Sequence, residues 1–127
     1  MDKFIDIDGK SVKFRATART PRLYRGLIGR DMIRDMERLR VAYNKAATLS
    51  EDASEEEKQD AQLSMVDLEI FENIAYVMAR QAAPDMEEQT ADEWLDKFNM
   101  FSIYQILPEL LKLWQLNTAT TSTPKKK

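Results

Sequence analysis

The sequence predicts a mostly α single domain with an N-terminal β-hairpin packed on the helices and a disordered C-terminal tail. An Asp-Gly pair stands between two short alternating apolar segments near the N-terminus, which is a strong hairpin signal. Apolar residues then recur at helical spacing over most of the chain. The last ten residues are mainly Thr, Ser and Lys, a composition typical of disorder. We place the helical domain at 1–117 and the tail at 118–127.

The predicted hairpin covers 4–14. Asp8-Gly9 suits a two-residue type I′ turn, because both central positions of that turn need a positive φ. Pairing about this turn sets Ile5 opposite Val12 and puts four apolar side chains on one face: Ile5, Ile7, Val12 and Phe14. A lone hairpin is marginal in water, so we expect this face to lie on the helices.

Two helices are predicted next. Thr20 is an N-cap candidate followed by Pro21 at the first helical position, and Gly29 ends the short helix that covers 22–28. A second helix starts near Asp31 and has an apolar inner face made of Met32, Met36, Leu39 and Tyr43. Its outer face carries Arg34, Asp35 and Arg38, where Asp31–Arg34 and Asp35–Arg38 are spaced to form ion pairs.

A long central helix is predicted from Ser54 to about Ala82 or Ala83. Ser54 and Glu57 have capping-box spacing, and the polar first turns that follow are expected to project into solvent. The apolar seam of this helix consists of Leu68, Phe71, Ala75 and Met78, widened by Ile70, Ile74 and Val77.

Two further helices complete the domain. Thr90 and Glu93 repeat the capping-box spacing and open a short helix that ends at Phe98. The last helix covers 102–116, and Pro108 predicts a kink or a break within it. Apolar residues occupy more than half of its circumference, so it is either enclosed by the domain or half covered by a partner.

Composition excludes many classes of site. The chain has no Cys and no His, which removes disulfides, thiol nucleophiles, Ser-His-Asp triads and nearly all zinc and copper sites. Carboxylate-only sites stay open, but no residue pattern marks one. We therefore expect no catalysis, no metal and no cofactor. The sequence also shows no signal peptide and no membrane span, which favours a cytoplasmic protein without a membrane partner.

Charge is unevenly distributed. Through Ser50 there are twelve basic and six acidic residues, and from Glu51 onward there are seven and sixteen. We expect the two halves to neutralise each other within the fold or between subunits. Eight arginines could instead contact a phosphate backbone, but no base-recognition motif accompanies them, so nucleic acid is not the expected partner. These arginines are Arg15, Arg19, Arg22, Arg25, Arg30, Arg34, Arg38 and Arg40.

The candidate partner-binding residues come from the aromatic and aliphatic block near the C-terminus. Trp and Tyr are enriched at interface hot spots, although most of these side chains are expected to close the core of so small a domain. Tyr104 and Trp114 are the two expected at an exposed apolar edge. The full candidate set is Trp94, Phe101, Tyr104, Leu107, Leu111 and Trp114.

Several segments together resemble the tail assembly chaperones of long-tailed, siphovirus-type bacteriophages and prophages of Gram-positive bacteria. Besides the Asp8-Gly9 hairpin, they are Thr20-Pro21-Arg22-Leu23-Tyr24-Arg25, Gly29-Arg30-Asp31-Met32, Asp67-Leu68-Glu69-Ile70-Phe71-Glu72-Asn73-Ile74-Ala75-Tyr76, Trp94-Leu95-Asp96-Lys97-Phe98 and Leu107-Pro108-Glu109-Leu110-Leu111-Lys112-Leu113-Trp114.

The resemblance implies a non-enzymatic chaperone that binds the phage tape measure protein and promotes tail-tube assembly. It further implies contact with tail-tube subunits, a place in the host bacterial cytoplasm and absence from the mature virion. A longer form made by programmed frameshift is also typical of the family, and the codons of Lys125-Lys126-Lys127 are the expected slippery site. A homo-oligomer is left open. The alternative is a small cytoplasmic nucleic-acid-binding regulator that uses the basic N-terminal half.

Overall fold

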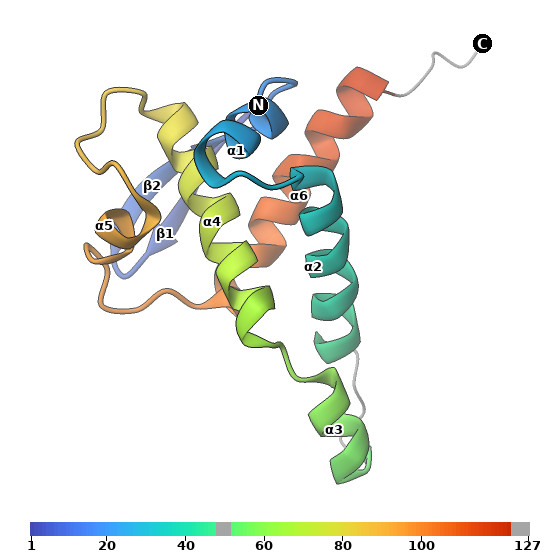
Figure 1. Cartoon of the computed structure of the whole chain (residues 1–127). Coiled ribbons are helices and arrows are strands. Elements are labelled where there is room, and N and C mark those ends of the chain that lie inside the picture. The colour runs from blue at the N-terminus through green and yellow to red at the C-terminus, as the bar shows by residue number, and fades with distance from the viewer. Residues whose placement is uncertain (48–51, 123–127) are drawn as a thin grey trace.

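The helix α4 forms the centre of the protein, and most of the other elements pack around it (Figure 1). The computed structural model describes residues 1–47 and 52–122, with side chains except at 47, 59–61 and 116–122. The described residues form two strands followed by six helices, so the mostly helical fold with an N-terminal hairpin is confirmed. Its elements are β1 (Asp2–Ile7), β2 (Lys10–Arg15), α1 (Thr20–Ile28), α2 (Met32–Ala47), α3 (Glu55–Ala61), α4 (Met65–Ala82), α5 (Ala91–Leu95) and α6 (Ile103–Ser122).

The hairpin has the predicted turn and register. Asp8 and Gly9 have φ values of 55° and 77°, and Ile5 pairs with Val12. Ile5, Ile7 and Phe14 are buried and Val12 is half-buried. β2 lies against α4 and β1 against α6, so the apolar face of the hairpin rests on helices as expected.

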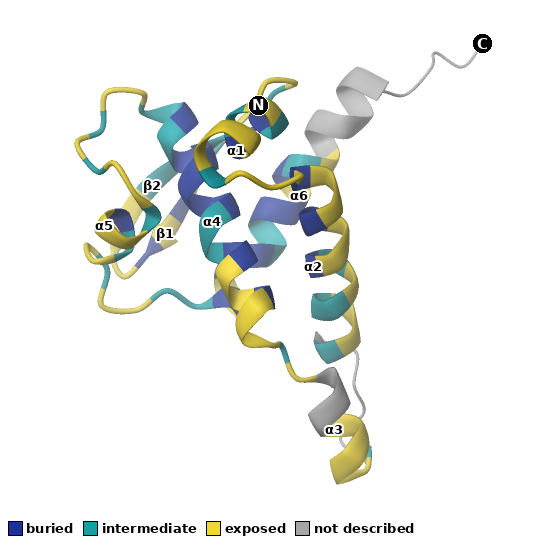
Figure 2. Ribbon diagram, viewed as in Figure 1, coloured by how far each residue is buried: buried dark blue, intermediate teal, exposed yellow. Residues whose placement is uncertain are grey.

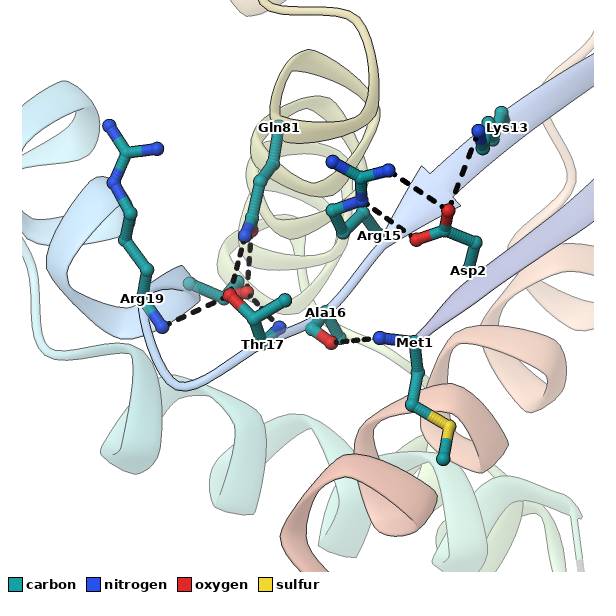
Figure 3. A network of polar contacts seen from close by, with 9 residues as sticks. Met1, Asp2, Lys13, Arg15, Ala16, Thr17, Arg19 and Gln81 are labelled. Atoms are coloured by element: carbon teal, nitrogen blue, oxygen red, sulfur yellow. Dashed lines mark hydrogen bonds and ion pairs between the residues drawn. The ribbon is translucent and has the colours of Figure 1, made fainter. Parts of the chain in front are cut away.

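The start of α1 differs from the prediction, because Thr20 is not its N-cap. Arg19 takes that position and makes no side-chain cap. The buried Thr20 hydroxyl instead donates to Oε1 of Gln81 in α4 at 2.6 Å and accepts from the Thr17 N–H at 2.8 Å. Gln81 Nε2 in turn donates to Thr17 Oγ1 at 2.6 Å, closing a polar cluster that Figure 3 shows. This cluster links the start of α1 to the end of α4. As predicted, α1 ends at Gly29, which has a φ of 82°.

The inner face of α2 is confirmed, but Asp35 does not lie on the outer face. Asp35 is 4% exposed and accepts hydrogen bonds from the Tyr24 hydroxyl at 2.8 Å and from Arg30 at 2.7 and 2.8 Å. Arg38 therefore pairs with Asp67 of α4 at 2.9 Å instead of Asp35. Asp35 directly borders the apolar stripe of α2, and its charge can be buried there because Arg30 and Tyr24 satisfy it.

The predicted long helix is two helices. Ser54 and Glu57 form the expected capping box, but α3 ends at Ala61. A second box begins α4, where the Ser64 hydroxyl accepts from the Asp67 N–H and Asp67 accepts from the Ser64 N–H, both at 3.0 Å. These bonds satisfy the N–H groups of Ser64 and Asp67, which in a continuous helix would donate to carbonyl groups one turn earlier. As a result α3 projects from the body of the protein (Figure 1).

The exposed side of α4 lies near this break. Leu68, predicted in the apolar seam, is 37% exposed, while Phe71, Ala75 and Met78 are buried as predicted. The first turns of α4 have little cover, whereas the rest of the helix is enclosed (Figure 2).

The C-terminal elements also depart from the predicted bounds. α5 ends at Leu95 rather than Phe98, and Glu93 accepts from the Gln89 N–H instead of completing a box with Thr90. α6 runs through Pro108 as one helix, so of the predicted kink or break the break is wrong. Proline removes a single backbone bond there, and the buried Ile106, Leu107 and Leu110 hold the helix against the core on both sides of it. The predicted boundary at 117 falls inside α6, and the tail residues 123–127 lie outside the described residues.

We expect the substitution Asp35→Asn to destabilise the protein by about 1–3 kcal/mol at pH 7, because it removes a charged acceptor from a buried network. The bonds from Arg30, with burial opposing them, hold the pKa of Asp35 below its ordinary value. Its ionised carboxylate thus stabilises the fold above the unfolded pKa of about 4, and this contribution is lost as pH falls through the folded pKa.

Urea unfolding at pH 7 and at pH 3 measures this effect. The difference between wild type and Asp35→Asn should shrink at the lower pH, where the wild type begins to lose the same charge. Asp85→Asn, at an exposed loop position, serves as the matched control and should unfold like the wild type at both pH values. An Asp35→Asn deficit that is the same at both pH values would contradict the prediction.

Candidate partner-binding surface

The six candidate residues do not lie on one surface. Trp94, Leu107 and Leu111 are buried at 2%, 0% and 9% exposure. Phe101 and Trp114 are half-buried. Tyr104 is exposed over 57% of its surface and is the most accessible of the set. Most of these side chains therefore belong to the core, as their size and apolar character led us to expect.

Trp94 is the centre of an aromatic cluster. The capped α5 holds it over the hairpin, where its ring meets Phe14 edge-on at a centroid distance of 6.3 Å. The rings of Tyr76, Phe98 and Phe101 lie at 6.0, 5.2 and 5.4 Å. Such pairs add about 0.5–1.5 kcal/mol each beyond the area they bury. Trp94 thus joins the hairpin, α4 and α5 and presents no surface to a partner.

An apolar strip remains between α2 and α6, which run side by side in opposite directions (Figure 1). At one end the Tyr104 ring packs on Tyr43 at 6.0 Å. Towards the other end the two helices enclose an open hollow of about 370 Å³. We call this surface the α2–α6 strip and define it by Ile33, Met36, Tyr43, Tyr104, Leu111 and Trp114.

The strip has the size and chemistry of a helix-docking surface. From Tyr104 to Trp114 it follows ten residues of α6, which corresponds to about 15 Å at the rise of an α-helix. Glu37 and Arg40 form a pair at 2.6 Å on the rim of the hollow, so the charges beside it are already neutralised. The hollow is therefore suited to an apolar side chain rather than to an ionic one.

Ile33 was missing from the sequence-based candidate set, although it is 56% exposed and lines the hollow. The available signal was an isoleucine one position after Met32, off the inner face of its helix. Periodicity alone identifies such a residue as displaced from the core, but does not say which neighbouring helix it faces.

The basic N-terminal half is largely engaged in ion pairs. Four of its arginines pair within that half, and Arg38 and Lys3 pair with carboxylates of the second half, at Asp67 and Glu109. Neutralisation between the halves is therefore a minor part of the pairing seen in the described residues. The four internal arginine pairs are Arg15–Asp2, Arg30–Asp35, Arg34–Asp31 and Arg40–Glu37. Lys10 and Lys13 also pair within this half, with Asp8 and Asp2.

Three carboxylates gather at α4 and form no ion pair among the described side chains, although the charge of Arg30 acts on one of them, Glu69. Glu72 is half-buried, and its pKa is raised by burial and by the nearby charges of Glu69 and Asp92. Within the described residues no group of Cys, His, Asp or Glu is arranged to hold a metal ion. The described helices also include none that is long and apolar enough to cross a membrane.

Comparison of the chain with protein-family models, with curated proteins and with solved structures finds no match. The α2–α6 strip and the charges around it therefore carry the functional argument.

We expect Trp94→Ala to lower the free energy of unfolding by about 3–5 kcal/mol, because it leaves a cavity among four aromatic rings. Tyr104→Ala, at the exposed end of the strip, should cost about 1 kcal/mol or less. Chemical denaturation followed by circular dichroism checks both values. Equal losses for the two variants would mean that Tyr104 belongs to the core.

Proposed function

We propose that this protein is a non-enzymatic chaperone that holds an apolar helical client on the α2–α6 strip. The observation that carries the proposal is the strip itself, which keeps Ile33 more than half exposed on the wall of an open hollow and Tyr104 more than half exposed at the opposite end. Exposed apolar side chains gathered in this way are typical of a protein contact. A client helix with apolar residues at i, i+3, i+4 and i+7 would place one side chain in the hollow and others along the tyrosine end.

The resemblance of the sequence to phage tail assembly chaperones supports one particular client, the tape measure protein. A long helical protein has apolar positions that stay uncovered until tube subunits surround it. A chaperone that covers those positions in the host bacterial cytoplasm would keep the tape measure protein soluble, and would leave as the tail tube grows. In this proposal the tail-tube protein is the partner that replaces the chaperone.

The alternative function is a nucleic-acid-binding regulator that uses the basic half. It is less favoured because most of the arginines concerned already pair with carboxylates, as at Arg38–Asp67 and Arg30–Asp35. Phosphate contacts would have to compete with those pairs. Arg19, Arg22 and Arg25 alone among the eight arginines form no ion pair in the described part of the chain.

Glutamate substitutions on the strip test the chaperone proposal. In co-expression with the tape measure protein of the same gene neighbourhood, wild type should keep the client soluble and be recovered with it in a pull-down. Ile33→Glu and Tyr104→Glu should each weaken binding about ten- to hundredfold, since burying such a side chain is worth about 1.5–3 kcal/mol.

Met65→Glu is the matched control, because Met65 is 85% exposed on α4 and does not belong to the strip. It should retain the client, and all three variants should keep the circular dichroism of wild type. A client that binds the two strip variants as tightly as the control would rule out the strip as its site.

Titration with duplex DNA separates the two functions. At low salt we expect weak binding or none, because a non-specific complex gains its free energy from counterions that unpaired basic side chains release. Fluorescence anisotropy at two salt concentrations measures this. Micromolar affinity that falls steeply with salt would favour the regulator instead.

A further inference from the structure

A second depression, lined by both polar and apolar side chains, lies on a different part of the surface, along α4. Two hollows of about 310 and 230 Å³ share Leu27, Ile28 and Asn73 and so form one groove between α1, α4 and the start of α5. Leu27 and Val66 are 41% and 45% exposed on its walls. None of its lining residues belongs to the α2–α6 strip. We call this surface the α1–α4 groove.

One side of the groove is acidic. Glu69 and Asp92 are exposed lining residues, and Glu72 lies close enough to both for their charges to act on it. These three carboxylates form no ion pair in the part of the chain that the structure describes. Arg30 also lines the groove; its guanidinium is bound to Asp35 at 2.7 Å, and its charge also acts on Glu69. The repulsion that Glu69 and Asp92 exert on Glu72 remains, and a positive partner would relieve it.

The adjoining face of α1 is basic. Arg22 and Arg25 are exposed, lie three residues apart on the outer side of α1 and form no ion pair among the described residues. Gly26 follows them, and the space around its missing side chain is open. Leu27 and Ile28 of the same helix line the groove, so Arg25 lies within one helical turn of the groove wall and of the exposed Leu27.

We propose that the α1–α4 groove and the outer face of α1 together form a dimerisation surface for a second copy of this chain. In a two-fold symmetric contact the same surface is used twice, so each patch must meet its complement on the partner. Here Arg22 and Arg25 of each copy lie over Glu69 and Asp92 of the other. Leu27 and Val66 of both copies then cover each other at the centre.

Charge complementarity favours a second copy over a different occupant. A basic helical peptide would satisfy the carboxylates but would bring its own positive charge towards Arg22 and Arg25. An acidic partner would meet the opposite conflict at Glu69. A second copy satisfies both patches at once, because it supplies both signs of charge in the same spatial order. This inference does not depend on the client proposed for the α2–α6 strip.

Sedimentation velocity on the full chain tests the dimer, from about 1 µM to about 1 mM protein, the range in which moderate affinities are resolved. Wild type should change from monomer to dimer as the protein concentration rises, and added salt should weaken the dimer. The double variants Arg22→Glu/Arg25→Glu and Glu69→Lys/Asp92→Lys each set like charges opposite one another. Each should weaken dimerisation at least tenfold.

The two variants together give the decisive result. Mixed in equal amounts they should dimerise again, since the reversed arginines of one face the reversed carboxylates of the other. Lys45→Glu/Lys58→Glu changes the same charge at exposed positions outside this surface and should dimerise like wild type. Circular dichroism checks the fold, and Glu69→Lys alone replaces the lysine double variant should that variant unfold. Wild type that stays monomeric throughout, or variants that dimerise separately but not better when mixed, would overturn the proposal.

Discussion

The structure depends on the enclosure of α4, since most of the other elements pack against that helix. Ile74, Ala75 and Val77 are fully buried there, and Met78 and Ala79 are buried on the following turn. A helix covered on nearly all sides must supply apolar contact in several directions, and small residues such as Ala75 and Ala79 let its neighbours come close. Five elements pack against α4 from these directions: β2, α1, α2, α5 and α6.

Polar contacts determine where the surrounding elements attach to α4. Gln81 holds the start of α1, Asp67 holds α2 through Arg38, and the Tyr76 hydroxyl donates to the Glu88 carbonyl of the loop before α5 at 3.0 Å. Apolar packing alone tolerates small sliding of one helix past another, whereas these bonds are directional. Every buried side-chain polar atom in the described residues has a partner, so the attachments bring no unsatisfied group into the core.

Once α4 is enclosed, apolar side chains stay exposed at several places on the surface, and two of these are the α2–α6 strip and the α1–α4 groove. The α2–α6 strip has its neighbouring charges paired, which suits an apolar client, while the α1–α4 groove has unpaired charges of both signs, which suits a second copy. A dimer through the groove would leave the strip accessible on both copies. Two strips carried by one dimer would hold a long client with higher avidity than either strip alone.

The sequence by itself determined the hairpin, because its turn, register and buried face follow from Asp8-Gly9 and from side chains that alternate at two-residue spacing. It also determined the inner face of α2, the inner face of α4 from Ile70 onward and the end of α1 at Gly29. The break at Ser64 rests on a local capping box that the sequence contains. Only the tertiary structure decided the partners of Thr20 and Asp35 and the position of Ile33 and Trp114 around one hollow. Local periodicity and capping act over a few residues, whereas these contacts depend on which elements meet once α4 is covered, and the sequence pattern of a single helix does not contain that information.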